Sequence, residues 1–308
     1  MNATAAPLSH PELKRRVTEF ARSASTEISP HDEELLPEIA NTLPRGTTVY
    51  VAHTPKAAVG DVVRIATKLT ALGLKASPHI VARRIESEQV LREALNQLAE
   101  AGVGQVLLVA GDRNPPAGVF SSTLEILDTG ATVDAGIKAL GVAGHPEGHP
   151  AVAPDVLWKA LAHKQAFANR SGTRVHIATQ FGFNPEGVRA WEGQLNERGI
   201  TLPIHAGIAG PTPIAKLLKF AVACGVGASL GSFMKNVGNM SKLAGGAATC
   251  DELLIRFVNT GAGSPASRIV QPHFYAFGGV MATVRWMRAL IDGAFELDAD
   301  GAKFAVNA

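Results

Sequence analysis

Short apolar runs rich in β-branched residues alternate with longer segments of helical periodicity along nearly the whole chain of 308 residues. This alternation favours strand–helix units built around a parallel sheet. The strands that we expect cover residues 24–28, 47–52, 76–81, 105–110, 138–143, 174–179 and 202–206, with the last one inside 267–275. Eight units are the number that closes a (β/α)8 barrel of the α/β class, a fold that typically needs ~250 residues.

The segments between these runs carry apolar side chains at the spacing of one helix face. We expect helices at 32–41, 60–72, 86–101 and 279–292. Asn184-Pro185 and Thr212-Pro213 each place a capping residue before a proline, which is typical of a helix start. Ser9 and Glu12 have the spacing of a capping box, which predicts an extra helix before the first strand.

The same pattern indicates one domain over residues 1–308, with about the first eight residues disordered. Residues 225–249 hold several glycines and are too many for an ordinary loop. We therefore expect a Gly-rich insertion before the last helix–strand unit, with short helices near the barrel mouth. An open, doubly wound sheet is the main alternative architecture.

Composition restricts the partners and the compartment. The net charge is +2 and no long run of lysine or arginine occurs, so we expect no nucleic-acid partner. The longest uncharged stretch, 220–234, is short of the ~20 residues that a membrane-spanning helix needs. Cys224 and Cys250 are too few for a disulfide framework, and residues 1–10 show no secretion signal. The sequence predicts a cytoplasmic protein and leaves a homo-oligomer open.

Polar side chains recur where the expected strands end. They are Glu27, His53, His79, Asp112, His145, Glu147, His149, Gln180, His205 and His273. Such groups are costly to bury without partners, so a whole ring of them suggests a polar cavity at the C-terminal mouth of the barrel. Glu27 and Asp112 are lone carboxylates placed where a general acid or an electrostatic anchor would lie. His205 and His273 suit core packing equally well, and His176 is interpreted as an ordinary packing or surface residue.

Other site types find less support in the residues. His145 and His149 are four apart, but Pro146 and Gly148 prevent a regular helix, so we predict no metal site. A metal-dependent barrel hydrolase remains an alternative that a metal assay would reveal. No nucleophile elbow or phosphate-binding loop occurs, and the glycines at 225–231 have the wrong spacing for a dinucleotide fingerprint.

Six strand-end segments, in the same order along the chain, resemble segments of the methylenetetrahydrofolate reductase family. They are STEISP (25–30), SPHI (77–80), VAGDRNPP (109–116), AGHPEGHP (143–150), IATQFGFN (177–184) and HFY (273–275). The resemblance covers about residues 25–290 and indicates a short, divergent member of bacterial type. It implies hydride transfer from NADH or NADPH, usually through bound FAD, to 5,10-methylenetetrahydrofolate. The product, 5-methyltetrahydrofolate, serves one-carbon metabolism and methionine biosynthesis.

The resemblance also implies residue roles. Glu27 matches the general acid that opens the methylene bridge of the folate. Asp112 matches the aspartate between flavin and pterin, so it is a candidate for catalysis, for substrate binding and for cofactor binding. Gln180 matches the amide that hydrogen-bonds the pterin.

The flavin-lining positions of the family fall on His79, His145 and His149. Other predicted cofactor contacts are His53, Gly111 and Lys164. Lys164 lies on the helix expected after the fifth strand and, together with Lys159 and His163, is a candidate to hold the cofactor phosphates.

This sequence departs from the family pattern at several cofactor positions. The usual Arg-Gly-Asp reads Ala110-Gly111-Asp112, and Gly278-Gly279 replace the Asn-Arg after the last strand. Losing a charge-assisted phosphate contact costs ~1.5–3 kcal/mol. Altered FAD binding and direct transfer from NADH therefore stay open. Another folate chemistry, such as methyl transfer, and a non-catalytic folate-binding protein also stay open as alternatives.

Overall fold

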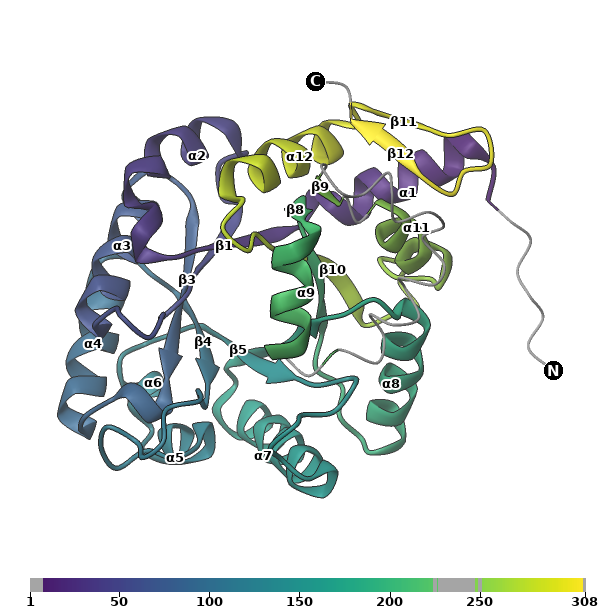
Figure 1. The fold of residues 1–308 in the computed structure, drawn as a ribbon. Helices are drawn as coiled ribbons and strands as arrows, with labels where there is room; N and C mark the ends of the chain where they lie inside the picture. Colours follow the sequence, from purple (N-terminus) through teal and green to yellow (C-terminus); the bar gives the residue numbers. More distant parts are fainter. Residues whose placement is uncertain (1–7, 224–225, 227–246, 249–250, 307–308) are drawn as a thin grey trace.

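Eight parallel strands close into one barrel in the computed structural model, which describes residues 8–223, 226, 247–248 and 251–306 (Figure 1). The barrel strands are β1 (Ser25–Ile28), β2 (Thr48–Val51), β3 (Lys75–Val81), β4 (Gln105–Val109), β5 (Ala139–Gly144), β6 (Arg174–Phe181), β7 (Ile204–Ala209) and β10 (Ile269–Tyr275). Each strand pairs with the next along the chain, and β10 pairs with β1 to complete the ring. The predicted single-domain (β/α)8 barrel is confirmed, and the open sheet is excluded.

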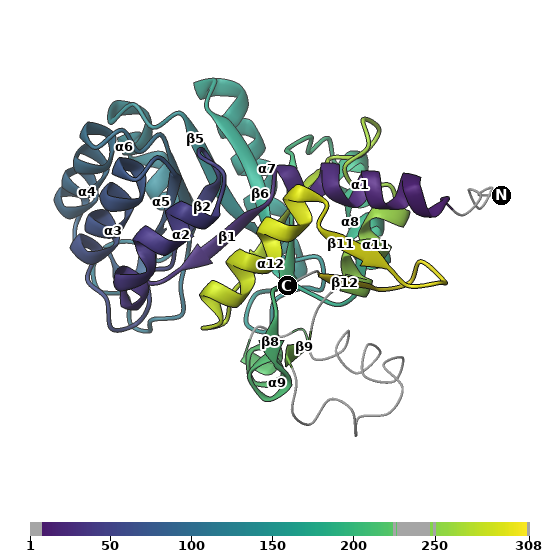
Figure 2. The same ribbon diagram turned by 90° about the horizontal axis from the view of Figure 1, so that it is seen from above.

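Helices surround this ring (Figures 1 and 2). They are α1 (His10–Arg22), α2 (Leu36–Thr42), α3 (Val59–Ala71), α4 (Glu88–Glu100), α5 (Thr123–Asp128), α6 (Ala131–Asp134), α7 (Pro154–Ser171), α8 (Pro185–Glu197), α9 (Ile214–Ala223), α11 (Asp251–Asn259) and α12 (Val280–Asp292), with the 3-10 helices η1 (Pro30–Leu35) and η2 (Ala82–Arg84). On α8, the side chains of Trp191 and Leu195 are buried.

Two short antiparallel pairs add to the barrel. One joins β11 (Phe295–Leu297) to β12 (Phe304–Val306), and the other joins β8 (Thr212–Pro213) to β9 (Ala247–Ala248). The extra N-terminal helix α1 packs against α11 and α12, beside the β11–β12 hairpin in both ribbon views. No helix in the described ranges is long and apolar enough to cross a membrane.

One predicted capping box is wrong. The Ser9 side chain makes no capping hydrogen bond, and Glu12 pairs with Arg15 instead of reaching back to the cap. Thr212 lies in β8 and its hydroxyl donates to the carbonyl of Gly210. The predictions about residues 1–7, about Cys224 and Cys250 and about most of 225–249 fall outside the described residues.

Apolar and polar side chains divide between the two faces of the strands. The main apolar cluster fills the space between the strands and the surrounding helices. A second cluster, formed by Tyr50, Leu107 and Ala178 with Val109, is much smaller. Polar side chains that hydrogen-bond to one another across the ring occupy the interior of this barrel. In most such barrels, branched aliphatic residues dominate the interior. The polar interior of this barrel positions the candidate site.

Candidate functional site

A layer of tyrosine and histidine side chains fills the middle of the barrel. The Tyr50 hydroxyl and His176 Nε2 are hydrogen-bonded at 2.8 Å, and Ser25 Oγ lies 2.9 Å from His273 Nδ1. The rings of His176 and His205 stack with centroids 3.9 Å apart. Burial lowers the pKa of His176 to about 4 and that of His273 to about 3, so these imidazoles are neutral near pH 7.

This layer bears on the predictions for His176 and for the pair His205 and His273. The interpretation of His176 as an ordinary packing or surface residue is wrong, because its ring lies inside the barrel and contacts Tyr50 and His205. The predicted strand contained His176, but its inward orientation depends on the phase of the strand, which one histidine does not reveal. His205 and His273, left undecided between core and site, belong to this inner layer.

Glu27 lies two residues after Ser25 on β1, toward the C-terminal end of the strand. Residues alternate in facing along a strand, so Glu27 shares the inward face of Ser25. It is also the register partner of the inward-facing Tyr50 on β2. Burial, and secondarily the negative charge of Asp32, raises the pKa of Glu27 to about 7. A carboxyl group with that pKa can hold a proton and release it near neutral pH, which is the property of a general acid.

Two polar groups near the mouth are buried without hydrogen-bond partners among the described residues. Both amide atoms of Gln180, at the end of β6, are unpaired, and so is Nε2 of His79 on β3. Burial lowers the pKa of His79 to about 4, so its ring is neutral. An unpaired buried donor or acceptor costs roughly 1–3 kcal/mol. A bound water, ion or ligand at such a position would complete the hydrogen bonding.

Aromatic rings form a wall on the β6–β10 side of the mouth. Phe277 stacks on Phe220 of α9 at 4.5 Å and contacts Phe181 at 4.8 Å. The Tyr275 hydroxyl donates to the carbonyl of Thr179 at 2.8 Å, which fixes its ring at the same edge. Phe277 has a φ of 44°, a backbone conformation that bulky residues rarely adopt. Sequence reasoning missed this wall, because its rings come from separate elements with no shared period.

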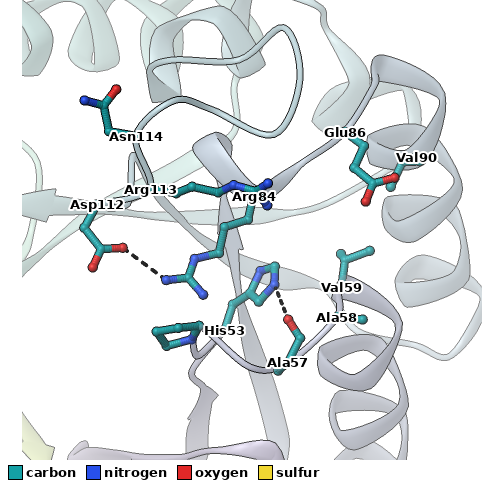
Figure 3. Close-up of a pocket in the computed structure, with 11 residues that line it drawn as sticks. His53, Ala57, Ala58, Val59, Arg84, Glu86, Val90, Asp112, Arg113 and Asn114 are labelled. Carbon is teal, nitrogen blue, oxygen red and sulfur yellow. Dashed lines mark hydrogen bonds and ion pairs between the residues drawn. The ribbon is translucent and has the colours of Figure 1, made fainter.

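An outer pocket of about 590 Å³ opens beyond the ends of β2, β3 and β4 (Figure 3). Arg84 Nη2 donates to Asp112 Oδ1 at 3.1 Å, and this guanidinium lowers the pKa of Asp112. The Asp112 side chain is 85% exposed, whereas that of Arg84 is 12% exposed. His53 Nε2 lies 3.1 Å from the carbonyl oxygen of Ala57, while its Nδ1 is buried and unpaired among the described residues.

Asp112 and Glu27 come from different strands, since Asp112 follows β4 and Glu27 lies on β1. Asp112 lies on the same C-terminal rim, but its carboxylate points toward Arg84 (Figure 3). Gly111 has a φ of +84°, and a Cβ there would lie 2.3 Å from Val81, so the loop needs glycine to reach this position.

A second pocket, of about 240 Å³, lies between the end of β5 and helices α7 and α8. His145 and Lys164 line it together with Trp158 and Trp191. Burial lowers the pKa of Lys164 to about 8 and that of His145 to about 4. His149 is exposed beside His145, with ring centroids 5.1 Å apart.

The two flanking candidates on α7 are paired on the surface, so they leave Lys164 as the cation of this pocket. Lys159 bonds Asp155 at 3.2 Å and His163 bonds Asp128 at 3.1 Å. In the described ranges, no three His, Cys, Asp or Glu side chains come together in an arrangement that could hold a metal ion.

Comparisons with known proteins agree with this architecture. The family model described as methylenetetrahydrofolate reductase matches residues 30–240, which is more than half of the chain. A putative phosphonomutase from Burkholderia cenocepacia J2315 has a TM-score of 0.50 at 9% identity, over 92% of this chain and 99% of that chain. A dihydropteroate synthase from Thermus thermophilus has a TM-score of 0.45 at 15% identity, over 87% of this chain and 91% of that chain. The likeness to the phosphonomutase supports the fold alone.

Proposed function

The chain belongs to the methylenetetrahydrofolate reductase family, and from this premise we propose that it reduces 5,10-methylenetetrahydrofolate to 5-methyltetrahydrofolate with NADH or NADPH. Membership makes it a folate-related barrel enzyme that acts on a small-molecule folate. The observation that carries the specific reaction is Glu27, an inward carboxyl group with a pKa near 7 at the barrel mouth. Glu27 precedes the matched range of 30–240, so its role rests on its place in the structure.

Glu27 is the proton donor in this proposal. Its carboxyl group protonates N10 of the folate, the C–N bond of the methylene bridge breaks, and an iminium forms between N5 and the methylene carbon. A hydride then adds to that carbon and completes the methyl group. A donor with a pKa matched to the working pH typically contributes ~10²–10⁴-fold to such a step.

The remaining mouth residues hold the folate. The unpaired amide of Gln180 offers a donor and an acceptor, which suits the alternating donors and acceptors on the edge of a pterin. The aromatic wall around Phe277 suits the flat rings of a folate, because aromatic pairs contribute about 0.5–1.5 kcal/mol beyond their buried area.

The predicted cofactor residues fit an anionic nucleotide such as FAD. His53 and Asp112 line the outer pocket, and Gly111 precedes Asp112 in the chain. His145 and Lys164 line the second pocket, His149 lies beside His145, and His79 lies on β3, between β2 and β4. The orphaned atoms of His53 and His79 and the buried ammonium of Lys164 are the groups that such a ligand would satisfy. Bound FAD would supply two-electron transfer between the nicotinamide donor and the folate.

The test is an anaerobic assay of the purified protein with methylenetetrahydrofolate and NADH or NADPH. We expect NAD(P)H oxidation that depends on the folate, with one 5-methyltetrahydrofolate formed per NAD(P)H consumed, and a visible spectrum typical of a flavin. Folate-independent NAD(P)H oxidation, or no 5-methyltetrahydrofolate, would reject the reaction. A colourless protein that is fully active would reject FAD and retain the reaction.

A further inference from the structure

We propose that Arg84 and His53 form a nucleotide-phosphate site in the outer pocket, and that Asp112 is the carboxylate which the phosphate displaces from Arg84. The assignment of a nucleotide rests on the proposed function, whereas the site itself rests on the groups around the pocket. The shared chemistry is a phosphorylated ribose, which both the hydride donor and a flavin dinucleotide contain.

Arg84 is a buried cation with spare hydrogen-bonding capacity. Its side chain comes from η2, directly after β3, and only 12% of it is exposed. Within the described part of the chain, its guanidinium makes a single hydrogen bond, to Asp112, and its Nε is buried and unpaired. A guanidinium carries five N–H donors in a fixed fork that matches a phosphate group in two-point contact. The donors left over therefore suit a phosphate better than the single bond they now make.

His53 supplies a complementary acceptor. A carbonyl oxygen can only accept, so the contact with Ala57 places the ring proton on Nε2 and leaves Nδ1 as an acceptor in the neutral ring. Burial lowers the pKa of His53, which keeps the ring neutral near pH 7. The buried, unpaired Nδ1 calls for a hydroxyl or N–H donor from a ligand. A nucleotide carries both groups, a phosphate that could bind Arg84 and a sugar hydroxyl that could donate to His53.

The pocket is lined by two cations, Arg84 and Arg113, and by two carboxylates, Glu86 and Asp112, and its helix end and its volume suit this ligand. Ala57, Ala58 and Val59, at the N-terminal end of the 13-residue helix α3, line it, and that end of a helix favours anions. The volume of about 590 Å³ lies within the ~300–1,000 Å³ of typical ligand pockets.

Asp112 is held weakly enough that another anion can displace it from Arg84. Its carboxylate is 85% exposed and reaches Arg84 through one hydrogen bond of 3.1 Å, an arrangement in which water screens the pair. A phosphate brings more charge and a two-point contact, so it wins the competition for Arg84. Displacement frees Asp112, so the pocket couples nucleotide binding to the position of this carboxylate.

Arg84 also lies next to the loop that carries Asp112. In that loop Asp112 follows Ala110 and Gly111. Arg84 reaches the same loop from the neighbouring strand, since β3 pairs with β4 up to Val81 and Val109. A guanidinium delivered from β3 can therefore serve the loop after β4.

The test is calorimetric titration of the purified protein with ADP, which carries the ribose and pyrophosphate shared by both ligand sources. We expect Arg84→Met to weaken ADP binding at least about tenfold, the loss typical of one charge-assisted contact. Lys56→Met removes an exposed cation from the adjacent loop and is the matched control for general electrostatics. It should change the ADP dissociation constant less than about threefold. Asp112→Asn should tighten ADP binding by about two- to fivefold, because the competing carboxylate is gone.

Two further readouts identify the source of the phosphate. Loss of bound flavin from Arg84→Met assigns the site to a flavin dinucleotide, and a raised KM for NAD(P)H with unchanged flavin content assigns it to the hydride donor. Wild-type ADP affinity in Arg84→Met, an equal loss in Lys56→Met, or weaker binding by Asp112→Asn would overturn the site. Because the titration needs no turnover, ADP binding through Arg84 in a protein without reductase activity would reject the reaction and keep the site.

Discussion

At the scale of one residue, the proposed role of Gln180 in folate binding implies a cost in stability. Its donor and acceptor are buried and unpaired among the described residues, so the folded protein loses hydrogen bonds to water there. We expect Gln180→Leu to raise the free energy of unfolding by about 1 kcal/mol and to raise the KM for the folate at least about tenfold. Urea unfolding and steady-state kinetics measure the two effects.

The control for Gln180 is Gln271 on β10. Its amide already donates to Ser25 Oγ at 3.4 Å, so Gln271→Leu should bring no gain in stability. Lower stability in Gln180→Leu, or an unchanged KM for the folate, would show that this amide is a satisfied structural group.

Candidate residues were predictable where they lie at a strand end. Glu27 and Gln180 were selected because each lies near the C-terminal end of its strand, and parallel strands bring their carboxyl ends together. Arg84 was missed, since its approach to Asp112 depends on the pairing of β3 with β4 and on the turn of η2. No local pattern in the sequence records such a contact between neighbouring loops.

At the scale of elements, two helix starts with similar sequence signals differ in the bonds they make. Asn184 Oδ1 accepts from the backbone N–H of Gly187 at 2.9 Å at the start of α8, whereas Ser9 makes no such bond at the start of α1. We expect Asn184→Ala to lower the free energy of unfolding by about 1 kcal/mol and Ser9→Ala to leave it within about 0.3 kcal/mol. Chemical denaturation of both variants checks the pair, and equal losses would refute the difference in capping.

The long, periodic elements were predictable and the short ones were not. Strands of the barrel agree with expectation to within a few residues, because most of them carry an apolar run flanked by turn residues. We did not predict the short helices α5 and α6 or the three-residue strands β11 and β12, because so few residues carry too little periodicity. Their placement follows from tertiary contacts.

At the scale of the whole molecule, a barrel with imidazoles at its centre should be sensitive to acid. His79, His176 and His273 have folded-state pKa values of about 4, about 4 and about 3, and that of His205 lies well below 6.5. Unfolded histidines titrate near 6.5, so the unfolded chain binds more protons than the folded chain between that pH and about 4. Stability is therefore lost as the pH falls through this window. Glu27, with its raised pKa, acts in the opposite direction but is one group against four.

We expect the free energy of unfolding to fall steeply between about pH 7 and about pH 5, by up to about 1.4 kcal/mol per pH unit for each histidine inside its window. Thermal unfolding across that range measures the slope. His79→Phe, which removes an imidazole with an unpaired nitrogen, should make the slope shallower, and His31→Gln, at an exposed position, should not. A slope independent of His79 would place the acid sensitivity elsewhere.

The proposed reaction depends most directly on the proton that Glu27 carries, and the rate of folate reduction against pH measures it. For the wild-type protein, we expect the rate to fall about tenfold per pH unit above about pH 7, because the carboxyl group loses its proton there. Glu27→Gln should be ~10²–10⁴-fold slower, without that decline, while it still oxidises NAD(P)H with an artificial acceptor. A Glu27→Gln variant that keeps the wild-type rate and the wild-type pH profile would contradict the account.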